Sequence, residues 1–308
     1  MNTALFPTFH FTATTGERAL VLGGGGSAGN AWLIGVIAGL FDAGLDVAHA
    51  DLTIGTSAGS TAAAQVTGAN PTELFAAMVA EPRPGTSPVR SDQGRAPHPP
   101  TATHLERFLA VIASTADVSD MRRRMGAAAL DQEAASDRSW QAHWRATVAS
   151  RLPSQRWPEQ SLIITAVDAH TGEPLVFDRH SGVDLVDAVA ASCAGGGLPY
   201  RIGENRYIDG GYRANAENAD LAVGYERVLV LSPLGGRTLH PLSWRTGLSV
   251  QVDHLRARSS RVETILPDSS AEHMFGANAM DLSLRPRAAQ AGYDQGTTHA
   301  EQLHEFWE

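Results

Sequence analysis

The chain has 308 residues, a formal net charge of −9 at pH 7 and a pI near 5.7. This acidic balance lacks the basic face that general nucleic-acid binding requires, so no nucleic-acid partner is expected. Hydrophobic residues make up 43% of the sequence, enough for a large core, and no apolar run approaches the roughly 18 residues of a membrane span. The N-terminus has no evident signal peptide, which predicts a cytoplasmic protein. The single cysteine, Cys193, excludes an internal disulfide.

The first predicted unit is a strand followed by a glycine-rich loop. The apolar run 19–22 leads into four consecutive glycines and then into a helix over 30–40 that ends at Gly44. Glycines at such a turn let backbone N–H groups approach an anion without interference from a Cβ atom. Two anions fit: the oxyanion of an acyl-transfer intermediate, or the pyrophosphate of a dinucleotide. The dinucleotide alternative needs an acidic residue about twenty positions further on, for which Asp46 and Asp51 are candidates.

The second unit is a strand over 52–54 that runs directly into Gly55-Thr56-Ser57-Ala58-Gly59. A buried strand that ends in Gly-x-Ser-x-Gly and continues into a helix of small residues is typical of a nucleophile elbow. The chain turns so sharply there that side chains beside the serine would clash, which accounts for Gly55 and Gly59. The turn also places the Ser57 hydroxyl at a helix N-terminus, where N–H groups favour negative charge.

Residues 81–158 interrupt the alternation of strands and helices. Six prolines fall within 82–100, which predicts a long loop. Helical patterns follow over three segments, and the first carries an apolar face. The segments are 103–114, 117–135 and 138–151, and the face comprises Leu105, Phe108, Leu109 and Ile112. We expect 81–158 to be an inserted cap whose helices cover the site and whose loop forms a mobile rim. The arginines at 122–124 are expected on a solvated helix face.

Further strands are predicted over 161–167, 175–177 and 227–231, and the tail 275–307 is mostly helical with a helix start at Arg285-Pro286. Alternating strands and helices predict an α/β fold over residues 1–308, with a mainly parallel central sheet covered by helices on both faces. The site loops would then lie at the carboxyl ends of the strands.

A third motif, Tyr207-Ile208-Asp209-Gly210-Gly211, places an aspartate on a glycine turn. By itself Asp-Gly-Gly is typical of a surface turn. The two glycine-rich loops upstream already indicate a site that lacks only a base, and Asp209 is the candidate for it.

In this order the three motifs resemble those of the patatin-like phospholipases: Gly-x-Gly-x-x-Gly at Gly24–Gly29, Gly-x-Ser-x-Gly at Gly55–Gly59 and Asp-Gly-Gly at Asp209–Gly211. The likeness covers about 18–70 and 160–235, including 191–194 and Asn215. It implies a serine hydrolase that cleaves acyl esters of lipids with a dyad, in which Ser57 is the nucleophile and Asp209 the general base. It also implies an oxyanion hole built from backbone N–H groups of Gly24, Gly25, Gly26 and Ala58.

Three positions depart from the family pattern. Ala28 replaces a basic residue common in the glycine loop, Gly195-Gly196-Gly197 replaces a segment that commonly contains a proline, and Glu217 replaces another proline. None removes a dyad member, but they leave the preferred substrate open. The expected partner is a lipid or acyl ester, with transient contact to a membrane surface, and the oligomeric state stays undetermined. Neither His170 nor His180 has a second ligand at metal-binding spacing, so no metal or cofactor is expected.

Two alternatives remain open. A Ser-His-Asp triad could use the same elbow with His254 or His273 as its late histidine, although the nucleophile comes very early for an α/β-hydrolase. The fold could instead serve as a non-catalytic or dinucleotide-binding module. Retention of both Ser57 and Asp209 argues against that module.

Overall fold

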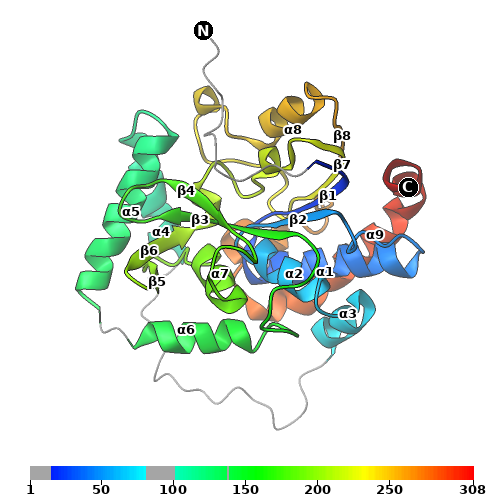
Figure 1. Cartoon of the computed structure of the whole chain (residues 1–308), viewed down its shortest axis with the longest axis horizontal. Helices are drawn as coiled ribbons and strands as arrows, with labels where there is room; N and C mark the ends of the chain where they lie inside the picture. The colour runs from blue at the N-terminus through cyan, green and yellow to red at the C-terminus, as the bar shows by residue number, and fades with distance from the viewer. Residues whose placement is uncertain (1–14, 81–100, 137–138) are drawn as a thin grey trace.

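The computed structural model describes residues 15–80, 101–136 and 139–308. In these residues an eight-stranded sheet lies between two layers of helices (Figure 1). The prediction of an α/β fold with a central sheet covered on both faces is confirmed. The predicted proline-rich loop over 81–100 lies outside the described residues.

Five neighbouring strands form the parallel centre of the sheet, in the order β3, β2, β1, β7, β8. Three short antiparallel strands extend it beside β3, and neither β5, β6 nor β8 is predicted from the sequence, because charged residues interrupt their apolar runs. The bounds are Gly16–Leu22 (β1), Leu52–Gly55 (β2), Leu162–Asp168 (β3), Pro174–Phe177 (β4), Tyr200–Ile202 (β5), Asn205–Asp209 (β6), Tyr225–Leu231 (β7) and Arg261–Ile265 (β8).

The register of the parallel strands brings the glycine-rich loops together. Leu22 at the end of β1 lies opposite Gly55 at the end of β2 on one side and opposite Leu231 at the end of β7 on the other. The loops that follow these three strands therefore leave the sheet at the same edge, as expected for a ligand site in an α/β fold.

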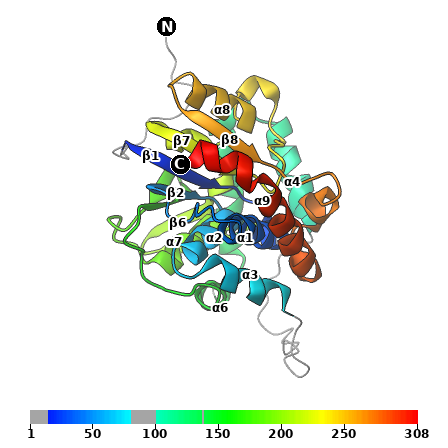
Figure 2. The same ribbon diagram turned by 90° about the vertical axis from the view of Figure 1, so that its right-hand side faces the viewer.

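Each face of β1 packs against a different helical layer, because successive side chains of a strand point to opposite faces. Leu20 and Leu22 join a core with α1, α2, α7 and α9, whereas Ala19 and Val21 join a core with α8 (Figure 2). The helices are Gly26–Asp42 (α1), Ala58–Val66 (α2), Pro71–Val79 (α3), Thr101–Ala113 (α4), Val118–Ala134 (α5), Trp140–Ala149 (α6), Leu185–Ser192 (α7), Leu248–Arg256 (α8) and Arg285–Trp307 (α9).

The predicted tail helix is confirmed as α9, and it packs closely along α1 through glycines on both helices. A Cβ atom built on Gly35 would lie 2.0 Å from the carbonyl oxygen of Ala289, and one on Gly292 would lie 2.3 Å from that of Trp32. Such separations are far below van der Waals contact, so only glycine permits this approach. The helix that begins in the glycine loop is thereby held between the sheet and the C-terminal helix.

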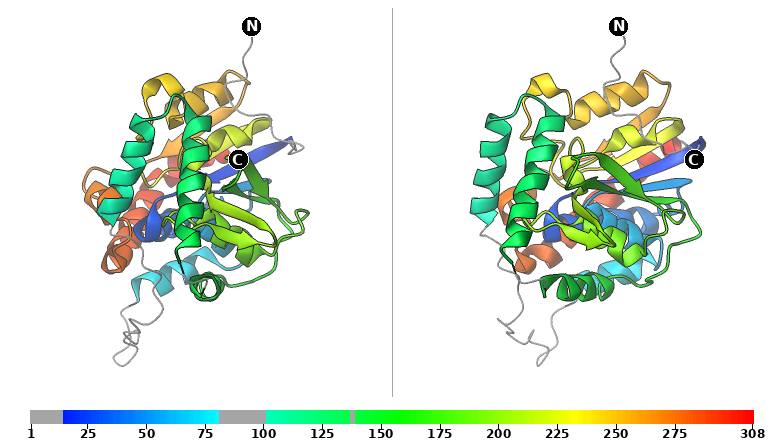
Figure 3. Two further views of the ribbon diagram at one scale, coloured as in Figure 1. Left: turned by 90° about the vertical axis from the view of Figure 1, so that its left-hand side faces the viewer. Right: turned by 60° about the vertical axis from the view of Figure 1, so that its left-hand side comes forward.

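Helices α4 and α5 pack against β3, β6 and the short turn η1, Gly210–Tyr212 (Figure 3). The apolar face predicted for α4 is divided: Phe108 and Ile112 pack toward Tyr212, whereas Leu105 and Leu109 are exposed. Helix α5 therefore packs against β6, the strand that ends at Asp209, while α4 packs against α5 and toward Tyr212. Their role as a cap over a bound acyl chain remains a prediction.

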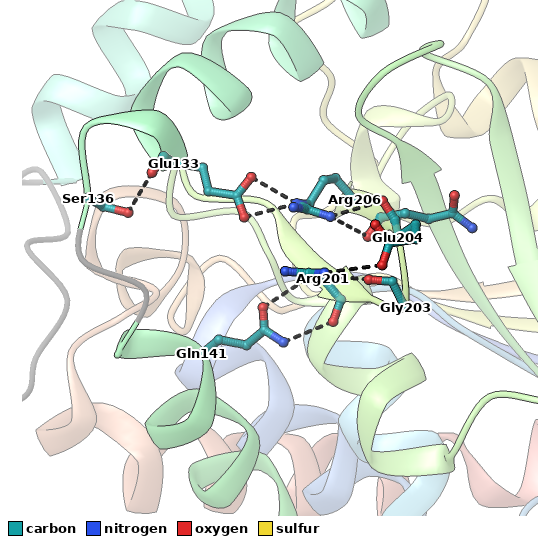
Figure 4. Close-up of polar contacts among 8 residues, drawn as sticks. Glu133, Ser136, Gln141, Arg201, Gly203, Glu204 and Arg206 are labelled. Atoms are coloured by element: carbon teal, nitrogen blue, oxygen red, sulfur yellow. Dashed lines mark hydrogen bonds and ion pairs between the residues drawn. The ribbon is translucent and has the colours of Figure 1, made fainter.

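The hairpin formed by β5 and β6 is tied to α5 and α6 by polar contacts (Figure 4). Glu133 at the end of α5 accepts two hydrogen bonds from Nε of Arg206, both of 2.9 Å. Gln141 on α6 exchanges hydrogen bonds of 3.1 and 2.9 Å with the backbone of Arg201. Since Asp209 is the last residue of β6, these contacts help to fix the strand that presents it.

The expectation that all three arginines at 122–124 lie on a solvated face is wrong for Arg122. Its side chain is 3% exposed and donates to the carbonyl oxygens of Gly172 and Arg213, each at 2.8 Å. Burial lowers the pKa of Arg122 to about 10. Arg123 and Arg124 are exposed, as predicted, and pair with Asp120. Helical periodicity therefore places one of the three consecutive arginines, Arg122, on the inner face of α5, where its role is structural.

Candidate active site

Ser57 lies between β2 and α2 with a backbone conformation of φ 52° and ψ −119°. A positive φ is uncommon for a residue with a side chain, and strain of this kind persists only where the surrounding structure enforces it. A Cβ atom on Gly59 would lie 1.9 Å from the carbonyl oxygen of Leu22, and one on Gly55 would lie 2.6 Å from Cα of Ser60. Both motif glycines are therefore sterically required by the turn.

We predict that Gly59→Ala destabilises the fold by about 3 kcal/mol or more, because the added methyl group collides with rigid backbone and not with a flexible side chain. The measurement is the free energy of unfolding in urea. Gly247→Ala is the matched control, since its Cβ would meet only Cγ2 of Thr238 at 3.5 Å. Equal stability of the two variants would contradict the prediction.

Two residues at the end of α7 hold the backbone of the elbow. The N–H of Ser57 donates to Oγ of Ser192 at 2.9 Å, and the Ser57 carbonyl oxygen accepts from Sγ of Cys193 at 3.1 Å and Oγ of Ser60 at 2.6 Å. Burial, reinforced by the charge of Asp209, raises the pKa of Cys193 to about 11, so its thiol stays protonated and acts as a donor. From the sequence, only the family resemblance marks this segment, and nothing in it indicates contact with the elbow.

The carboxylate of Asp209 accepts a hydrogen bond from the hydroxyl of Ser57. Oγ of Ser57 donates to Oδ2 of Asp209 at 2.8 Å, and the N–H of Gly211 donates to Oδ1 at 2.8 Å. Burial raises the pKa of Asp209 to about 6, although both hydrogen bonds oppose that shift. A Cβ atom on Gly195 would lie 2.9 Å from Oδ2, so the glycine run at 195–197 leaves room for the carboxylate.

Asn218 links the elbow to the turn that bears the aspartate. Its Nδ2 donates at 3.0 Å both to Oγ1 of Thr56, which precedes Ser57, and to the carbonyl oxygen of Gly210, which follows Asp209. Arg213 donates to Asn218 and forms a fully buried two-point ion pair with Asp220 at 2.8 and 2.7 Å. Removal of one partner from such a pair leaves an uncompensated buried charge, so each partner holds the other in position. Because Arg213 is fixed in this way, its hydrogen bond helps to keep Asn218 in place.

The glycine loop lies beside the nucleophile, because a Cβ atom on Gly24 would be 3.4 Å from Cβ of Ser57. The N–H of Gly24, however, already donates to the carbonyl oxygen of Ala216 at 2.9 Å. Among the described residues the N–H groups of Gly25, Gly26 and Ala58 have no acceptor. Of the predicted donors, Gly24 thus already has an acceptor in Ala216, while Gly25, Gly26 and Ala58 remain candidates, and the oxyanion hole itself stays a prediction.

The remaining motif glycines are structural. The N–H of Gly29 donates to the carbonyl oxygen of Gly25 at 3.0 Å and so closes the first turn of α1. A Cβ atom on Gly210 would lie 2.2 Å from Oγ1 of Thr165, and the N–H of Gly211 serves Asp209.

The histidines of the alternative triad make hydrogen bonds to other residues. The hydroxyl of Ser57 donates to Asp209, whereas Nδ1 of His254, on α8, lies against Arg258, and Nδ1 of His273 lies against the carbonyl oxygen of Ser270. The geometry thus favours a dyad over the Ser-His-Asp triad.

The two acidic residues considered for the dinucleotide alternative also make their hydrogen bonds away from the glycine loop. Asp51 accepts from the N–H groups of Glu17 and Arg18 at the start of β1, the opposite end of the strand from the glycine loop. Asp46 accepts from the N–H of Ala48 and contacts the ring of His49. Neither carboxylate is placed to bind a ribose held at the glycine loop.

The chain is similar to a solved structure and to a known protein family. VipD from Legionella pneumophila, a solved structure, aligns with a TM-score of 0.39 and 14% identity over 94% of this chain and 67% of that chain. No curated protein sequence matches. The family profile described as Patatin-like phospholipase matches residues 20–222, which is more than half of the chain and includes all three motifs. The chain therefore belongs to the patatin-like phospholipase family, whose domains are lipid acyl hydrolases acting on ester bonds.

Proposed function

We propose that this protein hydrolyses acyl esters of lipids with a Ser57–Asp209 dyad. The observation that carries the proposal is the 2.8 Å hydrogen bond from Oγ of Ser57 to Oδ2 of Asp209, made on a strained elbow at a helix N-terminus. A serine hydroxyl is a weak nucleophile until an adjacent base accepts its proton, and Asp209 is within reach of that proton.

In the proposed reaction, Oγ of Ser57 bonds to the carbonyl carbon of the ester while its proton passes to Asp209. The negative charge that develops on the carbonyl oxygen is bound by N–H groups of Gly25, Gly26 and Ala58. Fixed donors of this kind typically contribute about 3 kcal/mol each to the transition state. The alcohol then leaves with the proton from Asp209, and water hydrolyses the acyl-serine by the same steps.

The raised pKa of Asp209 suits this role. A carboxylate with a pKa of about 6 is a stronger base than an ordinary aspartate, yet it is still ionised near neutral pH. General bases are most effective when their pKa lies near the working pH. The pKa is raised because the sheet and the 195–197 loop bury the carboxylate, and no histidine is needed.

Exposed apolar side chains support transient contact of the active-site edge with a lipid surface. Leu239 and Leu242 follow β7 and are 51% and 90% exposed, while Met280 and Leu282, beyond β8, are each 61% exposed. Met280 belongs to the site edge, because a Cβ atom on Gly26 would lie 3.0 Å from its Sδ. In the described part of the chain, no helix combines the length and apolarity of a membrane span. We therefore propose surface contact through these loops.

The test is a panel of acyl esters that contains a diacyl phospholipid, a lysophospholipid, a diacylglycerol and p-nitrophenyl esters of two chain lengths, with released fatty acid measured. We expect release from at least one lipid ester, and parallel loss of that release when a fluorophosphonate labels Ser57. A thermal shift with NAD or NADP but no ester turnover would instead support the dinucleotide-binding module.

A further inference from the structure

A buried acid lies behind the glycine loop and has no part in the proposed reaction. Glu217 is fully buried, at the position where the family resemblance leads one to expect a proline. Its Oε1 accepts from Oγ of Ser232 at 2.5 Å, and its Oε2 accepts from Nδ2 of Asn215 at 2.7 Å. Buried carboxyl groups are costly unless they are hydrogen-bonded, and here both oxygens have a partner.

Glu217 connects three segments that meet at the active-site edge of the sheet. Ser232 directly follows β7 and also accepts from the N–H of Gly236 at 2.9 Å. Asn215 lies in the segment that follows the base turn. A Cβ atom on Gly23 would lie 3.4 Å from Cγ of Glu217, so the side chain of Glu217 lies next to the first glycine of the loop.

Ala216, the residue before Glu217, holds the glycine loop through a backbone hydrogen bond. The carbonyl oxygen of Ala216 accepts from the N–H of Gly24 at 2.9 Å, and Gly24 lies against the side chain of Ser57. The two hydrogen bonds of the Glu217 side chain hold the residue next to Ala216. A displacement of this segment would therefore move Gly24 and, with it, the N–H groups of Gly25 and Gly26.

Burial raises the pKa of Glu217, although the hydrogen bond from Ser232 opposes that shift. The hydrogen-bond partners of its side chain, Asn215 and Ser232, carry no ionisable group. The charged residues of its own segment, Arg213 and Asp220, are paired with each other. Among the described residues, the Glu217 side chain is therefore held by hydrogen bonds from neutral groups.

We propose that Glu217 is the positioning residue that holds the glycine loop in the geometry that binds the oxyanion. This inference rests on the proposed function, because the loop needs precise placement only if it stabilises a transition state. Misplacement of a catalytic group by about 1 Å costs on the order of a hundredfold in rate. The role is expected to affect turnover more than substrate binding.

The test compares Glu217→Gln, which keeps the shape of the side chain and its two hydrogen-bonding atoms, with Glu217→Leu, which leaves Ser232 and Asn215 without their acceptors. Glu226→Gln, at an exposed position on β7, is the matched control. The readouts are kcat and KM for one p-nitrophenyl ester, the pH profile from 5 to 10 and the melting temperature.

We expect Glu217→Leu to lower kcat by roughly tenfold to a hundredfold with KM within about threefold of wild type, while Glu217→Gln and the control retain kcat within about threefold. The pH profile is the second readout. Its acidic limb near pH 6, which Asp209 sets, should be unchanged in Glu217→Leu and Glu217→Gln. Where Glu217→Leu fails to fold, Ser232→Ala removes one of the two bonds and should lower kcat in the same direction.

Unchanged kcat in both Glu217→Leu and Ser232→Ala would overturn the inference, as would a Glu217→Gln variant that is folded but as slow as Glu217→Leu. These outcomes leave the proposed function standing if wild type hydrolyses esters. A wild type that neither hydrolyses any ester nor labels at Ser57 would overturn the proposed function and this inference with it.

Discussion

Replacement of Ser57 by alanine is expected to abolish ester hydrolysis, with kcat lower by roughly 10⁵-fold or more, and to remove labelling by a fluorophosphonate probe. Removal of a nucleophile costs about this much because no other group can form the acyl intermediate. The fold should survive, because Ser192 accepts from the backbone N–H of residue 57 and Cys193 donates to its backbone carbonyl oxygen, and neither bond involves the side chain. Mass spectrometry of the labelled protein identifies the site.

Ser60→Ala is a useful control for this experiment, since Ser60 is the nearby serine whose Oγ donates to the carbonyl oxygen of Ser57. Its variant should label at Ser57. Labelling that persists at another serine in Ser57→Ala would overturn the assignment of the nucleophile.

Replacement of Asp209 by asparagine is expected to lower kcat by about 10²- to 10⁴-fold, the usual contribution of a general base. Asparagine keeps the shape of the side chain but cannot accept the proton of Ser57. In wild type, kcat/KM should rise with pH through a midpoint near pH 6 and then reach a plateau, because the carboxylate must be ionised and its pKa is about 6.

The same replacement should change the pH dependence of stability. The folded-state pKa of Asp209 is raised from 3.8 to about 6, so the folded protein binds the proton more tightly than the unfolded chain. The stability that this proton contributes is present below about pH 4 and is lost as pH rises through 6, a difference of roughly 3 kcal/mol for a shift of this size. Asp209→Asn should therefore melt at a higher temperature than wild type at pH 8.

Two variants separate this base from the alternative one. His254→Asn and His273→Asn should retain wild-type kcat, since both rings bond to residues outside the site. Loss of activity in either histidine variant, together with an active Asp209→Asn, would contradict the dyad and favour the triad.

The sequence predicts the fold class and the three motifs because each depends on local chemistry. Alternating side chains define the faces of β1, and the sharp turns leave no room for a Cβ atom at Gly55, Gly59 or Gly210. Gly59 against the carbonyl oxygen of Leu22 is an example of such a requirement. Steric requirements of this kind involve residues that are close in the chain or at the end of the neighbouring strand. They can therefore be recognised from the spacing of glycines in the sequence.

The sequence failed where a residue acts through a distant partner. Ser192 receives the N–H of a residue 135 positions earlier, and Asn218 bonds to Thr56 across 162 positions. Arg122 looks like its two exposed neighbours until the carbonyl oxygens that it meets are known. No local pattern encodes these pairs.

The glycine loop shows most clearly which features the sequence determines and which only the tertiary structure decides. Sequence alone determined that backbone N–H groups would gather beside a serine, since only glycines allow that approach. Only the tertiary structure decided which of them remain available, because the carbonyl oxygen of Ala216 takes the N–H of Gly24. The tertiary structure also decided that Glu217 is a buried acid and not a surface charge, because the sheet edge and the loop after β7 exclude water from it. A hydrogen bond satisfied between distant segments depends on how strands and loops meet, and that is settled only by the packed fold.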